Sequence, residues 1–170
     1  MAFRRELTQV INVKGQIKAS KGSSESNAIM NNAIGKFESE LPYIVSTVAN
    51  KLGEHAVNDQ KESISQLRAM KCGTLRNSIV MTGGSGGLTV KKEVGTAMNN
   101  KYPYILIKGR GEVRPVRAKA LYFRNICGKG MRFAKRSAPA RPKDYMKLAD
   151  SKLSAALPGI VEGAMSGLKL

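Results

Sequence analysis

The sequence contains few of the residues from which metal sites, disulfide frameworks and aromatic cores are built. Its 170 residues include one histidine, two cysteines and no tryptophan, and aromatic residues make up 5%. One histidine (His55) excludes a multi-histidine metal cluster, and two isolated cysteines (Cys72 and Cys127) do not make a disulfide framework or a zinc site. No nucleophile is paired with a base, so we expect no enzymatic activity and no cofactor.

Long apolar runs are also missing. The two best, residues 41–49 and 102–107, are shorter than the roughly 20 residues needed to span a bilayer, and both contain proline. The first six residues lack the apolar core and cleavage site of a secretory signal, so we expect a cytosol-like compartment and no membrane contact. Apolar residues nevertheless make up 42% of the chain, enough for one globular domain with extended appendages.

Acidic residues are scarce in one part of the chain. The whole sequence has 29 Lys and Arg against 12 Asp and Glu, a formal charge of +17. Residues 1–70 carry 9 basic and 7 acidic side chains, residues 71–149 carry 18 and 3, and residues 150–170 carry 2 and 2. The basic character therefore belongs to the segment 71–149.

Apolar residues recur at spacings of three and four from Ala28 to Met70, which predicts helix. Asn27 is the expected N-cap, and Gly73 the expected stop. Pro42 either kinks one long helix or opens a second. Upstream, residues 1–26 are expected to form an N-terminal arm with a short strand near Val10, followed by a polar linker.

The next segment has the pattern of strands. Residues 75–81 and 88–94 flank a glycine-rich stretch, 82–87, and together predict a hairpin with a glycine tip. A phosphate-binding loop is disfavoured, because no Lys-Ser/Thr pair completes the stretch and no helix follows it. Residues 102–107 and 120–123 read as further strands.

A basic loop is expected over 128–143, and a final helix begins at Asp144 and is broken at Pro158-Gly159. The predicted fold class is therefore α+β: an N-terminal long helix or helix pair, a small antiparallel sheet with a glycine-tipped hairpin, and a C-terminal helix. The expected organisation is an arm and linker over 1–26, one domain over 27–157 and a tail over 158–170.

Five motifs follow one another in a recognisable order, and together they carry a family resemblance. They are Gly73-Thr-Leu-Arg-Asn-Ser-Ile79, Val94-Gly-Thr96, Tyr102-Pro-Tyr-Ile105, Ala118-Lys-Ala-Leu-Tyr-Phe123 and Pro139-Ala-Arg-Pro142. Over residues 43–157 the chain resembles the tail-completion or head-to-tail joining proteins of long-tailed bacteriophages. It departs from them in two places: Tyr104–Gly109 lacks the family's acidic residue, and no aromatic residue follows Pro142.

The resemblance implies a structural virion protein, made in the cytoplasm of the host bacterium and located in the neck or tail of the virion. Its members form a sixfold ring through which the genome passes. The implied partners are further copies of the chain, neighbouring connector or head-completion proteins, tail-terminator or tail-tube proteins, and double-stranded DNA in the lumen. The resemblance assigns structural roles to the matched residues Gly73, Leu75, Arg76, Ser78, Ile79, Tyr104 and Pro142.

The basic segment supplies the candidates for contact with DNA or with neighbouring subunits. They are Lys108, Arg110, Arg114, Arg117, Lys119, Arg124, Lys129, Arg132, Lys135, Arg136 and Arg141. A ring about 30 Å tall would surround roughly 18 phosphates of duplex DNA, far fewer than the charges on six copies. Most of these cations therefore cannot face DNA, and many are expected to meet acidic protein surfaces. The alternative is that they are solvated charges with no specific contact.

The alternative is a basic nucleic-acid-binding protein, associated with ribosomes or the nucleoid. Tyr122, Phe123 and Phe133 lie among cations, as backbone contact and base stacking require. Against this alternative, aromatic residues are few and no RNP-type, GXXG or zinc pattern is present.

Overall fold

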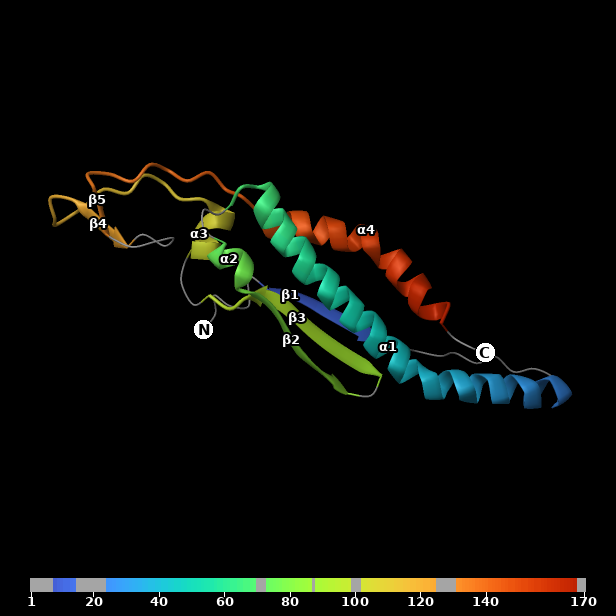
Figure 1. Ribbon diagram of the computed structural model, residues 1–170. Helices are drawn as coiled ribbons and strands as arrows, with labels where there is room; N and C mark the ends of the chain where they lie inside the picture. The colour runs from blue at the N-terminus through green and yellow to red at the C-terminus, as the bar shows by residue number, and fades with distance from the viewer. Residues whose placement is uncertain are drawn as a thin grey trace.

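Two long helices and a three-stranded antiparallel sheet form the body of the chain (Figure 1). The computed structural model describes residues 8–14, 24–69, 73–86, 88–98, 102–124 and 131–167. Their elements are β1 (Thr8–Lys14), α1 (Ser24–Gln66), α2 (Thr74–Asn77), β2 (Ile79–Gly86), β3 (Thr89–Thr96), α3 (Tyr102–Lys108), β4 (Leu121–Arg124), β5 (Met131–Ala134) and α4 (Tyr145–Met165). The predicted α+β class, with a long N-terminal helix and a C-terminal helix, is confirmed.

Helix α1 lies between the sheet and helix α4 (Figure 1). On the sheet side, Leu41, Val45 and Ala49 pack with Val90 of the central strand β3. On the other side, Val48 and Leu52 belong to a cluster that includes Ile160 of α4. Helix α1 thus has two apolar faces, one toward the sheet and one toward α4. This is why apolar residues recur at spacings of three and four along most of the helix.

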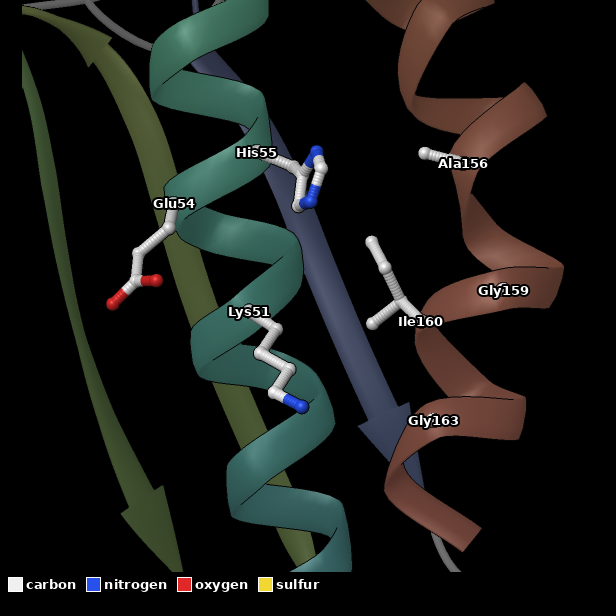
Figure 2. Close-up of a pocket in the computed structure, with 7 residues that line it drawn as sticks. All are labelled: Lys51, Glu54, His55, Ala156, Gly159, Ile160 and Gly163. Carbon is white, nitrogen blue, oxygen red and sulfur yellow. The ribbon is translucent and has the colours of Figure 1, made fainter. Parts of the chain in front are cut away.

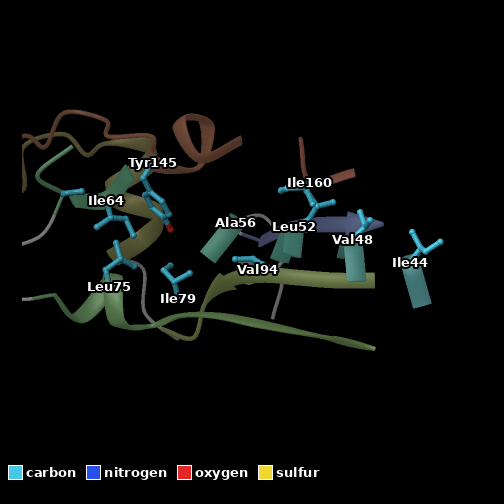
Figure 3. Close-up of a cluster of buried hydrophobic side chains, with 11 residues drawn as sticks. Ile44, Val48, Leu52, Ala56, Ile64, Leu75, Ile79, Val94, Tyr145 and Ile160 are labelled. Atoms are coloured by element: carbon cyan, nitrogen blue, oxygen red, sulfur yellow. The ribbon is translucent and has the colours of Figure 1, made fainter. Parts of the chain in front are cut away.

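A second group of apolar side chains packs together near the C-terminal end of α1. Figure 3 shows Ile64, Leu75, Ile79 and Tyr145 gathered there, contributed by α1, α2, β2 and α4. Between the two groups, the buried side chain of Gln60 donates from Nε2 to the Val94 carbonyl at 3.3 Å. This bond ties α1 to the central strand of the sheet.

Helix α1 is one continuous helix with Pro42 inside it, so the proline does not open a second helix. The ribbon changes direction along its N-terminal half (Figure 1), as expected for a proline that removes one hydrogen bond. The helix begins at Ser24, and the predicted N-cap at Asn27 is wrong.

The predicted stop at Gly73 is also wrong, because α1 ends at Gln66 in a closed turn. Arg68 adopts a positive φ of 45°, and the Ala69 and Arg68 amides donate to the carbonyls of Ile64 (2.9 Å) and Ser65 (3.0 Å). This pair of bonds terminates a helix without requiring glycine. Gly73 instead precedes α2.

The beginning of one segment predicted as a strand (75–81) and the whole of another (102–107) are helical. Residues 74–77 form the short helix α2, and Tyr102–Lys108 forms α3 rather than a strand. A short apolar run does not distinguish strand from helix by periodicity, and Pro103 fits the first turn of a helix. Tertiary contacts decide the case, since the Tyr102 hydroxyl donates to the Ala69 carbonyl at 3.0 Å and Leu106 packs on the core. Burial raises the pKa of Tyr102.

The predicted hairpin is confirmed, but most of its glycine-rich stretch belongs to strand β2. Gly83 and Gly84 pair with Lys92 and Lys91 of β3. Gly83 has a φ of 147°, and a Cβ there would lie 2.2 Å from the carbonyl oxygen of Lys91. At Gly84 a Cβ would meet nothing within 4 Å. The close approach of the two strands therefore requires glycine at position 83 and not at position 84.

We predict that Gly83→Ala lowers the free energy of unfolding by on the order of 2–3 kcal/mol, because both the φ angle and the strand contact are lost. The matched variant Gly84→Ala is expected to be neutral, or more stable by up to about 1 kcal/mol. Urea unfolding of the three proteins measures both values. Equal losses in the two variants would contradict the geometry.

Helix α4 begins as predicted and ends later than predicted. The Asp144 side chain caps it by accepting from the Lys147 amide at 3.0 Å. The predicted break at Pro158-Gly159 is wrong, because the helix continues to Met165. Ile160 and Ala164 pack on the body beyond the proline, and that burial outweighs the lost hydrogen bond. The predicted tail beginning at residue 158 is therefore mostly helix.

The predicted N-terminal arm contains part of the sheet. Strand β1 pairs along its length with β3, from Thr8 opposite Gly95 to Lys14 opposite Thr89. The helix that follows begins inside the segment predicted as linker, at Ser24. Residues 1–7 and 15–23 lie outside the described residues.

Tyr145 is fully buried, and its hydroxyl has no hydrogen-bond partner among the described residues. Burial, reinforced by the charge of Asp144, raises its pKa from 10.0 to about 12. In the unfolded chain the phenol ionises at its ordinary pKa, so the folded state loses stability as the pH rises from 10 to 12.

We predict that the free energy of unfolding of the wild type falls by about 2 kcal/mol between pH 10 and pH 12 relative to that of Tyr145→Phe, which lacks the ionising group. Urea unfolding of both proteins at pH 9, 10, 11 and 12 checks it, because the lysines titrate alike in both. Parallel stability curves would show that burial does not hold the phenol neutral.

Candidate functional site

A long extension leaves the body between α3 and α4 (Figure 1). We call residues 108–141 the basic arm; its described parts are 108–124 and 131–141. Its two sides run antiparallel, joined by bridges between Arg110 and Ala140 and between Val113 and Ser137. At the far end β4 and β5 form a two-stranded sheet in which Tyr122 faces Phe133. The loop predicted over 128–143 therefore contains a strand.

The root of the arm is fixed to the ends of α1 and α3. Gly109 has a φ of 76°, and a Cβ there would lie 2.8 Å from the carbonyl oxygen of Ala140 and 2.9 Å from Cδ of Pro142. The Lys143 amide donates to the Leu106 carbonyl at 2.8 Å, and its Nζ donates to the Arg68 carbonyl at 2.9 Å. The two sides of the arm can approach here only because residue 109 is glycine.

The residues of the family-like motifs lie mostly beside this root. Leu75 and Ile79 are buried in the core, as predicted. Ser78 donates to the Leu75 carbonyl and lies 2.7 Å from the Thr96 hydroxyl, joining α2 to β3. The remaining residues occupy the turn before α2 (Gly73), the exposed side of α2 (Arg76), helix α3 (Tyr104) and the segment before α4 (Pro142).

Charge divides sharply between the arm and the body. The described residues of the body, within 8–14, 24–107 and 142–167, contain eleven basic and ten acidic side chains, so this body is nearly neutral. The arm contains eleven basic residues and one acidic residue, Glu112. Ten of the eleven cations predicted as contact candidates therefore lie in the described parts of one projecting element.

Two of the predicted candidates make contacts within the arm. Arg110 is half-buried: its Nη2 donates to the Ser137 hydroxyl and, at 3.4 Å, to the Ala138 carbonyl. Its buried Nε has no partner among the described residues. Arg114 is exposed and pairs with Glu112 at 2.6 Å. Arg110 thus braces the arm.

The other candidates are distributed over both sides of the arm. Those with exposed side chains are Lys108, Arg117, Lys119, Lys135, Arg136 and Arg141. Arg124 and Arg132 belong to β4 and β5, and Lys129 lies outside the described residues. Like charges at this density repel one another, so an anionic partner would stabilise the arm.

The far end of the arm exposes aromatic and apolar side chains. Phe133 is 70% exposed and packs only edgewise on Tyr122, with ring centroids 5.4 Å apart and planes inclined at 55°. The Tyr122 hydroxyl donates to the Met131 sulfur, and Met131 is also exposed. A two-stranded ribbon without a core is marginally stable alone, so this surface has the character of an interface.

A shallow groove lies between α1 and α4 (Figure 2). It encloses about 540 Å³ and is lined by Lys51, Glu54, His55, Ala156, Gly159, Ile160 and Gly163. His55 and Ile160 point toward each other across it, while Glu54 points away from α4. His55 is exposed, and no acid-base pair converges on the groove. Sequence reasoning missed this groove, because glycines on a helix give no pattern of their own.

Polar groups further along the α1–α4 interface are structural. Glu62 pairs with Lys152 at 3.0 Å. Asp59 has its pKa raised by burial, an effect that the charges of His55 and Lys152 partly oppose. In the part of the chain that the structure describes, no group of three His, Cys, Asp or Glu residues could hold a metal ion. No helix there is long and apolar enough to cross a bilayer.

We predict that Arg110→Ala loosens the arm at its root. Loss of the two side-chain hydrogen bonds should raise amide exchange at Val113 and Ser137 by roughly 10- to 100-fold, because bonds from a charged donor are worth about 1.5–3 kcal/mol. Arg114→Ala removes an exposed ion pair and should change exchange less than about threefold. Hydrogen-exchange mass spectrometry compares them, and equal effects would contradict a bracing role for Arg110.

Comparison of the chain with protein-family models, with curated proteins and with solved structures finds no match.

Proposed function

We propose that this chain is a structural virion protein of a tailed bacteriophage. In this proposal it is a tail-completion or head-to-tail connector subunit that forms a ring at the neck, joins the tail to the capsid and surrounds the DNA channel. The partners are further copies of the chain, the connector and tail proteins above and below, and duplex DNA in the lumen. The proposal includes no enzymatic activity.

The observation that carries the proposal is the projecting arm on a nearly neutral body. Ten excess positive charges are concentrated in an element with no core of its own, while the described body has an excess of one. An element of this kind gains stability when it is laid against another molecule, as in subunits that order one another during assembly. Of the matched motif residues, Pro142 lies at the root of the arm, beside Gly109.

The amount of charge favours protein partners over DNA for most of the arm. A ring about 30 Å tall would surround roughly 18 phosphates. Six arms would bring about 60 excess positive charges, more than three times that number. Tight binding would also hinder DNA that has to slide. The positive charges in excess of the phosphates are therefore better matched by acidic surfaces of neighbouring virion proteins than by DNA.

The proposal predicts that charge reversal on the arm blocks assembly. Arg117→Glu with Lys119→Glu, and separately Lys135→Glu with Arg136→Glu, should lower the yield of infectious particles by about 100-fold or more, because several charged contacts are reversed in every copy. The matched control is Lys36→Glu with Lys147→Glu, exposed body residues with the same change of charge. Titres, with counts of assembled and DNA-filled particles, measure the effect. Wild-type titres from both arm variants would refute the proposal.

The nucleic-acid-binding alternative is favoured by one observation, the two-stranded ribbon of the arm with an aromatic pair at its end. A ribbon of this width fits the major groove of duplex DNA, and exposed aromatic rings stack on unpaired bases. Ring-shaped particles in negative-stain micrographs support the neck proposal. Tight binding of the monomer to RNA, with a steep dependence on salt, supports the alternative.

A further inference from the structure

We infer that the end of the basic arm of one copy docks on the C-terminal half of α4 of the next copy. This inference rests on the proposed ring assembly and names the two surfaces that would make it. A ring requires contacts between two different patches of the same chain, because a patch that pairs with itself closes a dimer.

The described residues expose ten large apolar side chains, and seven of them fall in two groups. The first group lies on the arm and comprises Val116, Tyr122, Met131 and Phe133. The second lies on α4 and comprises Leu157, Val161 and Met165. The other three are scattered singly on α1, β2 and the β2–β3 turn. The two groups are therefore the candidate patches for burial against another molecule.

The body covers only one side of the second half of α4, although this half is apolar on its other sides too. Residues 155–165 contain a single charge, Glu162. Ile160 packs on α1, whereas Leu157, Val161 and Met165 recur every four residues on one side of the helix and remain 43%, 38% and 42% exposed. On its other side, a Cβ at Gly159 or Gly163 would meet nothing within 4 Å. A helix segment that is apolar all round belongs in a buried position, so a further layer should cover it.

The arm end of the same chain lies away from that surface in the structure. Figure 1 shows β4 and β5 at one end of the elongated molecule and the C-terminal end of α4 toward the other. The side of the arm from 109 to 120 spans up to about 40 Å when extended, and α4 is about 32 Å long. An arm of this reach can extend along the body of a neighbour, and repetition of such a contact propagates from copy to copy.

The chemistry of the two patches is complementary. Phe133 and Tyr122 are large, rigid anchors of the type that dominates interfaces, and the α4 surface offers the exposed apolar side chains of Leu157, Val161 and Met165. The arm cations around the anchors would approach Glu162, the one charge on that part of α4. Two α4 surfaces placed face to face would leave both arm ends exposed, so the head-to-tail contact covers more apolar surface.

Two single substitutions and their mixture test the contact. Phe133→Ser removes an anchor from the arm, and Val161→Lys places a positive charge on α4 that repels the arm. Both positions are exposed, so the fold should not change. The matched controls are Tyr43→Ser and Val80→Lys, exposed residues outside both patches. Sedimentation velocity and light scattering give the oligomeric state over a range of concentrations.

The wild type and both controls should form the same oligomer, and each test variant should raise the dissociation constant by about 30-fold or more. An equimolar mixture of the two test variants should form a one-to-one complex and nothing larger, because only one intact arm can meet one intact α4 surface. Assembly of Phe133→Ser like the wild type, with loss only in Val161→Lys, would show self-pairing of α4 and overturn the inference. A mixture that stays monomeric would overturn it too.

A photo-crosslinking residue at position 133 separates this inference from the proposed function. Cross-links in purified particles to residues 155–165 of another copy support both. Cross-links to a different virion protein, or to DNA, overturn the inference and leave the function standing. Particles that lack the chain refute the function, and the solution experiment then decides the inference alone. A wild-type chain that is monomeric in solution and yields no such cross-link in particles overturns the inference.

Discussion

The burial of α1 on two sides is the constraint on which the rest of the structure depends. Leu41, Val45 and Ala49 need the sheet, while Val48 and Leu52 also need Ile160 of α4. At about 25 cal/mol for each Å² of apolar surface, burial is the main favourable term for a body of this size. It also explains why α4 remains helical past Pro158, since the contact with α1 continues beyond the proline. The arm contributes nothing to this core and is free to serve another molecule.

Much of the body could be predicted from the sequence, because its elements follow simple patterns. Long amphipathic periodicity identified α1 and α4, the side chain of Asp144 marked a helix start, and paired apolar segments marked the β2–β3 hairpin. The errors fall where tertiary contacts override local preference. Tyr102–Lys108 is apolar and contains Tyr and Ile, which favour strands, yet the Tyr102 hydroxyl and Leu106 hold it as a helix. The end of α1 depends on Arg68 in a conformation that no pattern predicts for arginine.

In the candidate site, too, the sequence predicted the composition but not the geometry. Counting charges located the basic segment, because charge is read directly from the sequence. It could not show that the segment projects, since the described parts of its two sides meet, apart from β4 and β5, at two isolated bridges that no local pattern predicts. Nor could it separate Arg110, whose guanidinium turns inward on Ser137, from Arg117 a few residues away. Only the fold shows that Leu157 and Val161 lie outside the core that Ile160 joins.

The bridge between Arg110 and Ala140 at the root of the arm allows the arm to change in length and sequence during evolution. The Arg110 and Ala140 backbones exchange two hydrogen bonds, at 2.9 and 2.8 Å, so the body holds the two ends of the arm as close together as the ends of a tight turn. Everything between them can lengthen, shorten or change composition at little cost to loop closure, which grows only slowly with loop length. The body can therefore keep one architecture while successive descendants acquire different partners. Variation in related chains should accumulate between Arg110 and Ala140 and spare the frame of Gly109, Lys143 and the end of α1.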